Sequence, residues 1–270
     1  MKHLYYGVGG LLLLSIMAAA LAYAIPAAWV AQHLAGAAGG RVQLAHARGL
    51  WHHGSGVLVL SSGAGGADAV HWAQRVYWDI KPQRSPLLWA LRVTWPEVGP
   101  PLPVMLRLGL SGWTADVAPW RGVIPLSALA GLGAPFNTLG LEGAAQISLS
   151  ALQFSSVPNV KPTAEPNVEI NIARLRSALA QGVVLGDYVL RGHANAAGGA
   201  FALRTTQGAL LLDGQGQCRA HERASRLSCG FEGTARAARH DDALLGNLLG
   251  LMGKQQIQSS SKNPITELRW

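Results

Sequence analysis

The sequence predicts a mainly β protein, in which a single amino-terminal transmembrane helix is followed by a curved, mostly antiparallel β-sheet domain with a few short helices. Three observations predict this class. Residues 4–25 form an apolar run without a charged side chain, the later sequence alternates apolar and polar residues, and 33 glycines and 14 prolines provide frequent turns. With 49% hydrophobic residues, the composition excludes a disordered chain. The fraction of charged residues, 13%, is lower than the ~25% typical of soluble domains.

The amino-terminal run is long enough to cross a membrane. A helix over residues 4–25 rises about 1.5 Å per residue and therefore spans the ~30 Å hydrocarbon core. A cleavable signal peptide ending at Ala22-Tyr23-Ala24 is the alternative, although the run exceeds a typical signal region of ~7–15 apolar residues. Aromatic side chains that suit the membrane interface stand at its edges: Tyr5, Tyr6 and Trp29. The predicted organisation is a cytoplasmic tip at 1–3, a transmembrane helix at 4–25, a linker at 26–40 and a β-rich periplasmic domain at 41–270.

The two cysteines indicate an oxidising compartment such as the periplasm. Cys218 and Cys229 lie on two short predicted strands around a polar turn, so a hairpin brings them close enough to form a disulfide. Such a disulfide contributes on the order of 2–3 kcal/mol through loop entropy. Buried free thiols are one alternative, and a zinc site with His221 is another that lacks a matching second ligand cluster. We therefore predict the disulfide.

The domain after residue 40 is predicted to be antiparallel sheet. Each predicted strand has one apolar face and short connections, whereas parallel strands need long crossovers and read as continuous apolar runs. The strand over 70–80 is the clearest, with His71, Arg75 and Asp79 on its polar face. The apolar faces of the five predicted strands are Val70, Trp72, Val76, Trp78 and Ile80; Leu87, Trp89, Leu91, Val93 and Trp95; Val104, Leu106, Leu108 and Leu110; Ala145, Ile147 and Leu149; and Val168, Ile170 and Ile172.

Helices are predicted at two places. Residues 174–181 are a short candidate, and residues 241–252 carry an apolar stripe that is expected to pack on the sheet. The stripe consists of Leu245, Leu248, Leu249 and Met252. A Leu-x-Gly or Phe-x-Gly sequence also recurs, ending at Gly143, Gly192, Gly214 and Gly233. Glycines at matching points of successive strands allow bulges or bends that curve a sheet, although chance in a glycine-rich chain explains the same pattern.

The sequence holds no recognisable catalytic motif. It contains no G-x-S-x-G, no H-E-x-x-H and no phosphate-binding glycine loop. His46, His52 and His53 cluster around Trp51, but one window of histidines is weak evidence for a metal, and a surface or turn role is expected. Basic residues are scattered singly despite a net charge of +8, which argues against a nucleic-acid partner. We expect no enzyme activity, no cofactor and no metal.

Several motifs occur in a recognisable order along nearly the whole chain. After Pro-Ala-Ala-Trp-Val at 26–30, a modified G-x-x-W-x-G signature contains Gly49, Trp51 and Gly54, with one extra residue before the second glycine. The other motifs are the tryptophan strand at 78–82, Leu87-Leu88, the L-G-D-Y sequence of Leu185, Gly186, Asp187 and Tyr188, Leu212-Asp213-Gly214, and a leucine-rich helix at 244–253. In these motifs the chain resembles the protein N family of the type II secretion system, the machine that moves folded periplasmic proteins across the outer membrane.

The resemblance implies a non-enzymatic, single-pass protein of the cell inner membrane, with a cytoplasmic amino end and a periplasmic carboxyl-terminal β domain. It implies a role in protein transport, with other inner-membrane subunits of the type II secretion system and membrane lipid as partners. The family is distantly similar to AsmA-like proteins, whose curved sheets offer an apolar groove for lipid. A periplasmic carrier of lipid or another apolar ligand is therefore the alternative. A hydrolase with residues dispersed along the chain is a third hypothesis.

Overall fold

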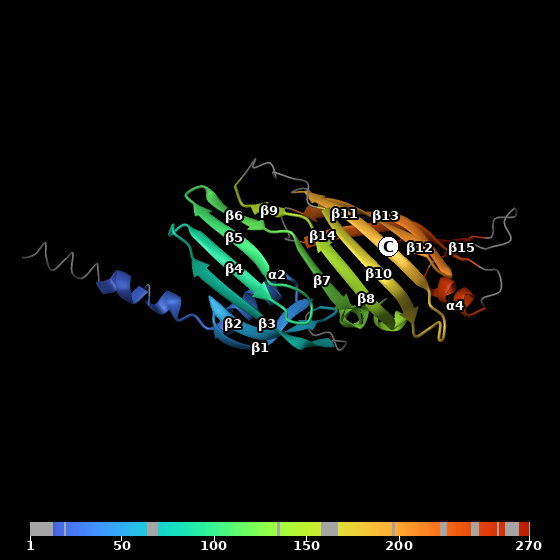
Figure 1. Ribbon diagram of the computed structural model, residues 1–270, viewed down its shortest axis with the longest axis horizontal. Helices are drawn as coiled ribbons and strands as arrows, with labels where there is room; N and C mark the ends of the chain where they lie inside the picture. Colours follow the sequence, from blue (N-terminus) through green and yellow to red (C-terminus); the bar gives the residue numbers. More distant parts are fainter. Residues whose placement is uncertain are drawn as a thin grey trace, which may run out of the picture.

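The protein is built from two antiparallel β-sheets and a few helices. The computed structural model describes residues 13–18, 20–63, 70–133, 136–157, 167–195, 198–221, 226–238, 243–252, 254–256 and 265–269. Strands make up more than half of the described residues, which confirms the predicted mainly β, antiparallel class. In Figure 1 the two sheets follow one another along the long axis of the molecule, with the amino-terminal helical segment at one end and α4 near the other.

The first sheet has seven strands in the order β1-β2-β3-β4-β5-β6-β9. Three of its hairpins turn at 51–52, 83–87 and 110–111. Because neighbouring strands run in opposite directions, these three turns lie at the same end of the sheet, which we call the hairpin end. The strands are β1 (Val42–Leu50), β2 (His53–Leu60), β3 (Val70–Pro82), β4 (Leu88–Thr94), β5 (Leu102–Gly109), β6 (Gly112–Val117) and β9 (Leu152–Ser155).

The second sheet has nine strands in the order β15-β16-β14-β13-β12-β11-β10-β8-β7, all paired antiparallel. Its central strands are long and joined in sequence, so the middle of the sheet is a meander from β10 to β14. The strands are β7 (Trp120–Pro125), β8 (Leu141–Leu149), β10 (Asn167–Ser177), β11 (Gly186–Asn195), β12 (Gly198–Gln207), β13 (Leu210–His221), β14 (Arg226–Ala237), β15 (Lys254–Gln256) and β16 (Ile265–Arg269).

The chain crosses between the two sheets twice. Strand β6 ends at Val117 in the first sheet and β7 begins at Trp120 in the second, while β8 and β9 make the return crossing after Leu149. The strands that flank the two crossings pair with each other: β6 pairs with β9 in the first sheet, and β7 pairs with β8 in the second. Proline 119 lies in the first crossing and lacks the N–H that would continue the ladder. The two sheets are therefore joined at adjacent strands by two neighbouring crossings of the chain, which we call the corner between the sheets.

The main core lies on the apolar face of the nine-stranded sheet. Helix α4 (Ala243–Met252) packs there through Leu245, Leu248 and Leu249, which are 0–2% exposed, so the predicted apolar stripe is confirmed at these positions. The expected residues 241 and 242 at its start lie outside the described residues. The 3₁₀ helix η1 (Leu126–Leu132) and helix α3 (Phe136–Leu139) follow β7, and Leu126 joins the same core.

The predicted helix at 174–181 is wrong. Strand β10 continues to Ser177 and the chain then turns, because Leu175 is buried and its carbonyl oxygen accepts the N–H of Leu185 at 2.8 Å. A bulge interrupts the strand at Arg174, whose φ is +52°. The Asp187 carboxylate accepts the Arg174 N–H at 2.6 Å and holds the bulge. A long-range contact therefore outweighs the local helical pattern.

The expected apolar face of 104–110 is also partly wrong. Val104 is buried, but Leu108 is 47% exposed and Leu110 is fully exposed. Strand β5 ends at Gly109, so Leu110 belongs to the turn at 110–111 at the hairpin end. In β3, by contrast, Val76 and Trp78 are buried as the alternation predicts.

The amino-terminal residues that the structure describes are helical at 13–18 and 20–23, and the expected span at 4–25 lies partly outside them. Among the described residues, no helix combines the length and the apolar character needed to cross a membrane. Residues expected to form a linker contain helix α2 (Ala27–Ala37), which packs against β1.

Candidate functional site

The modified glycine-tryptophan signature forms the turn between β1 and β2. Gly49 has φ +93° and stands opposite Gly54 in the strand register. A Cβ at Gly54 would lie 2.5 Å from the Trp78 ring, so only glycine allows that ring to lie across the hairpin. The Trp78 Nε1–H donates to the carbonyl oxygen of Trp51 at 3.0 Å. The signature thus joins the turn to β3.

The same turn holds the end of the amino-terminal segment. The N–H of Trp51 donates to the carbonyl oxygen of Ile25 at 3.0 Å, and Pro26 forms a β-bridge with Leu50. The ring of Tyr23 lies 4.0 Å from the ring of His52, centroid to centroid. A pocket of about 650 Å³ opens here, and most of its exposed lining is apolar. It is lined by Tyr23, Trp51, His52, Ile80, Pro82 and Trp89, among others.

The three histidines near Trp51 do not converge on one point. His53 contacts Asp79, with 3.2 Å between Nδ1 and Oδ2, whereas the Nδ1 atom of His52 is buried without a hydrogen-bond partner in the described structure. His46 lies in a β1 bulge with φ +51°. Burial raises the pKa of Asp79, but hydrogen bonds from Lys81 and His53 outweigh this and lower its pKa overall. The described residues contain no group of three ligands that would hold a metal ion.

The L-G-D-Y sequence ties four strands of the second sheet together. Leu185 and Tyr188 are 2% and 1% exposed, and the Tyr188 hydroxyl donates to the carbonyl oxygen of Leu210 at 2.9 Å. Gly186 has φ +151°, and a Cβ there would lie 2.5 Å from the carbonyl oxygen of Gln207. The motif therefore needs glycine for a close backbone approach.

Asp187 fixes the neighbouring turn and bulge by accepting hydrogen bonds. Its carboxylate accepts the backbone N–H of Arg174 and the Nε2 amide of Gln207, both at 2.6 Å. These bonds, the one from Arg174 first, favour the ionised form and lower the pKa of Asp187. The four predicted residues of this motif therefore lie together and hold neighbouring strands in place, and none of them lines the pocket at Trp51.

Cys218 and Cys229 form the predicted disulfide. They stand directly opposite each other in the β13–β14 hairpin, with their Cα atoms 4.0 Å apart and an S–S distance of 2.08 Å. The hairpin prediction is also confirmed, although the strands are longer than the short ones expected.

Two phenylalanine rings lie over glycines in the same part of the sheet. Gly216 stands opposite both Phe201 and Phe231, and a Cβ at Gly216 would lie 2.2 Å from the Phe201 ring. Gly214 stands opposite Gly233, and a Cβ at Gly214 would lie 2.5 Å from the Phe231 ring. The rings are nearly parallel, with centroids 6.0 Å apart. Recurrent glycines on adjacent strands therefore make room for two aromatic rings.

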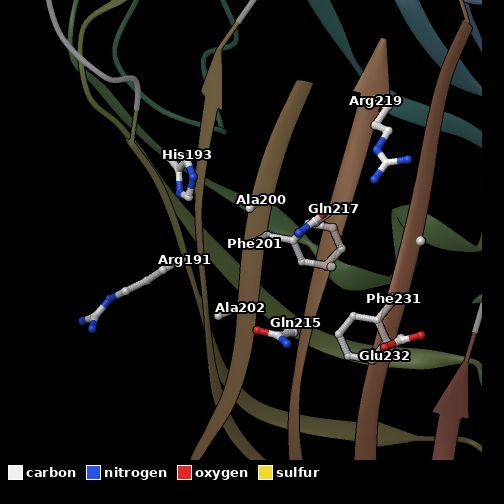
Figure 2. A pocket seen from close by; sticks show the side chains of 12 residues that line it. Arg191, His193, Ala200, Phe201, Ala202, Gln215, Gln217, Arg219, Phe231 and Glu232 are labelled. Carbon is white, nitrogen blue, oxygen red and sulfur yellow. The ribbon is translucent and has the colours of Figure 1, made fainter. Parts of the chain in front are cut away.

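A pocket of about 650 Å³ lies on strands β11 to β14, as Figure 2 shows. We call it the polar pocket for its charged and amide side chains, although half of its exposed lining is apolar. The small residues of its lining are Ala200, Ala202, Gly216 and Gly230, and Phe201 and Phe231 contribute aromatic surface. Arg191 and Arg219 lie on opposite sides of the pocket in this view. The remaining polar side chains around it are His193, Gln215, Gln217 and Glu232.

Arg191 is oriented by a carboxylate on the next strand. Its Nε lies 2.8 Å from Oε2 of Glu169 in β10. Hydrogen bonds from Asn171 and then from Arg191 lower the pKa of Glu169, so this acid is ionised at neutral pH. The described lining offers hydrogen-bonding and charged groups but no serine, threonine, cysteine or lysine nucleophile. Such a surface suits recognition of a polar partner.

The sequence alone did not reveal this pocket. Its lining comes from four strands, and each strand contributes only two to four residues. The available signal was the alternation of Gln215 and Gln217 with glycines, together with Ala200 and Ala202 at alternate positions of β12. Only the pairing register brings these short patterns side by side.

The architecture defines a class: a protein of two joined antiparallel sheets, with a disulfide between two neighbouring strands and an open pocket of the kind that serves binding or assembly. The sequence model of type II secretion system (T2SS) protein N matches residues 40–261. The chain belongs to this family, as its motifs predict, and the family is one of secretion components that is not known as an enzyme family. No curated protein and no solved structure matches the chain.

Proposed function

We propose that this protein is a non-enzymatic component of the type II secretion system, held in the cell inner membrane by residues 4–25, with its β domain, residues 41–270, in the periplasm. Family membership over residues 40–261 carries the proposal. The Cys218–Cys229 disulfide supports the periplasmic location, because disulfides persist in oxidising compartments. The helical conformation of residues 13–18 and 20–23 supports a helical apolar run.

The polar pocket supports a contact with another inner-membrane subunit. Its charged and amide side chains offer hydrogen bonds from several strands at once. The orientation of Arg191 by Glu169 gives the pocket a preset charged group. In this proposal the protein acts by binding and positioning partners, and exoprotein release depends on that assembly.

The first test is a gentle detergent purification of the tagged full-length protein from its native membrane, with proteins and lipids identified by mass spectrometry in the same sample. Recovery of inner-membrane secretion subunits, together with loss of exoprotein release on gene deletion, is expected. Stoichiometric lipid without secretion subunits contradicts the proposal and favours a lipid carrier.

A matched pair of variants tests the pocket. Ala202→Glu places a charged side chain in the pocket lining, whereas Ala144→Glu adds the same group at an exposed position of β8 outside the pocket. We expect roughly tenfold weaker retention of the partner with Ala202→Glu only, because disruption of a central contact costs more than ~1 kcal/mol. Equal retention by the two variants contradicts a contact at the pocket.

A further inference from the structure

Large apolar side chains are exposed at the hairpin end of the seven-stranded sheet. Leu110 is fully exposed, and Leu87 and Phe154 are each more than half exposed. Such a concentration is unusual on a protein surface that meets only water. We call this set the apolar tip; it comprises Leu87, Leu108, Leu110, Trp113 and Phe154.

The apolar tip is contiguous across four neighbouring elements. Leu108 stands opposite Trp113 in the β5–β6 hairpin, and its N–H donates to the carbonyl oxygen of Leu87 at 2.7 Å. Phe154 of β9 stands opposite Ala115, the next residue after Trp113 on that face of β6. The five side chains therefore form one patch at one end of one sheet.

The amino-terminal segment joins the molecule at that same end. Trp51, in the β1–β2 turn, binds the carbonyl oxygen of Ile25, and this turn shares the hairpin end with the turns at 83–87 and 110–111. In Figure 1 this end, at the left of the view, is the one from which the amino-terminal helical segment leaves. At ~4.8 Å between strands, the apolar tip extends to about 25 Å from the attachment point. A membrane that holds residues 4–25 is therefore within reach of it.

The charges around the apolar tip are those that suit an anionic lipid surface. Lys81, Arg84 and Arg107 are exposed there. Lys81 lies 3.2 Å from Asp79 and Arg107 lies 3.4 Å from Asp116, so the charges of these two pairs offset each other and Arg84 supplies the net positive charge. Exposed aromatic and aliphatic side chains beside basic residues are typical of protein surfaces that enter the headgroup region of a bilayer.

We propose that the apolar tip docks into the headgroup boundary of the membrane that holds residues 4–25. The sheet then meets the bilayer at two places, the segment attached at Trp51 and the apolar tip, which sets the orientation of the periplasmic domain. The proposal rests on the proposed function, because it requires the amino-terminal segment to be a membrane anchor.

The test uses the full chain in vesicles of phosphatidylcholine and phosphatidylglycerol. A single cysteine at Leu110→Cys carries an environment-sensitive fluorophore, and the native cysteines remain bridged. The matched control is Ser62→Cys, an exposed position just beyond β2 at the opposite end of the same sheet. Lipids with a nitroxide near the headgroup end of the acyl chain are then added to quench probes that enter the bilayer.

We expect about twofold or greater quenching at position 110 and none at 62, because interfacial side chains bury to ~5–10 Å. Flotation of the protein with the vesicles without selective quenching at 110 overturns docking of the apolar tip and leaves the anchor intact. Failure of the full chain to float with the vesicles overturns both the anchor and the docking. Quenching at 110 in phosphatidylcholine alone that equals quenching with phosphatidylglycerol overturns the role assigned to the basic residues.

Discussion

The hydroxyl of Tyr188 donates a hydrogen bond of 2.9 Å to the carbonyl oxygen of Leu210, although β12 lies between their two strands. The N–H of Leu210 in turn donates to the carbonyl oxygen of Leu185 at 2.9 Å. The start of β13 is therefore held from both sides by the L-G-D-Y motif. In this chain the motif therefore fixes the start of β13 against β11 through two hydrogen bonds to Leu210, which we call the clasp.

Removal of the Tyr188 hydroxyl should weaken this clasp. We expect Tyr188→Phe to lower the free energy of unfolding by about 1 kcal/mol, because a buried hydrogen bond is lost while the ring stays packed. Urea unfolding of the full-length protein in detergent measures the change. Tyr77→Phe is the control, since Tyr77 is 46% exposed. An equal effect of both changes contradicts a special role for the Tyr188 bond.

Tyr188 should also make the protein sensitive to alkali. Burial, and then the charge of Asp187, raises the pKa of Tyr188 in the folded state. The neutral Tyr188 hydroxyl therefore contributes to the free energy of unfolding. This contribution is fully present below the ordinary tyrosine pKa of about 10 and is lost as the pH rises from there toward the raised folded-state pKa. Thermal unfolding between neutral and alkaline pH should therefore show a smaller alkaline loss for Tyr188→Phe than for the wild type.

The lowered pKa of Asp187 predicts that stability is lost at acid pH instead. Hydrogen bonds from Arg174 and Gln207 lower its folded-state pKa, so its contribution is present above the ordinary carboxyl pKa of about 4 and is lost as the pH falls through the lowered value. Asp187→Asn should lower the melting temperature at neutral pH and flatten its fall in acid. Asp213→Asn, at a 72% exposed carboxylate, is the control. Parallel acid profiles for wild type and Asp187→Asn would contradict this account.

The disulfide should stabilise the domain only when it is formed. Cys218→Ser is expected to lower the free energy of unfolding by about 2–3 kcal/mol under oxidising conditions, because the unfolded chain regains the freedom of the closed loop. Under reducing conditions the variant and the wild type should melt at similar temperatures. Differential scanning calorimetry with and without reductant makes the comparison. An unchanged melting curve for the oxidised variant would rule out this contribution.

Two Gly→Ala changes should have opposite signs. Gly216→Ala places a Cβ 2.2 Å from the Phe201 ring and should cost about 1–3 kcal/mol through overpacking. Gly246→Ala places a Cβ in open space inside α4 and should stabilise by up to ~1 kcal/mol, because alanine favours helix. Denaturant unfolding measures both. Addition of Phe201→Leu to Gly216→Ala should recover part of the loss, and no recovery would mean that the ring is not the obstacle.

The features that sequence reasoning predicted well depend on local periodicity or on short separations. Alternation indicated the buried positions Val76 and Trp78, helical spacing indicated the stripe of α4, and a turn between two cysteines indicated the disulfide. The glycine-tryptophan motif lies in the β1–β2 turn and the L-G-D-Y motif at the start of β11. Their contacts, such as Trp78 with Trp51, were not predictable from spacing.

The sequence by itself determined the mainly antiparallel β class, the disulfide pair and the family, because these depend on which side chains alternate and recur along the chain. The tertiary structure alone decided that 174–177 remains a strand, that Leu110 is exposed, and that four strands form a polar pocket. The physical reason is that a periodic pattern reports how a residue prefers to be buried, whereas the Asp187 carboxylate, the corner between the sheets and the strand register act through contacts between residues far apart in sequence.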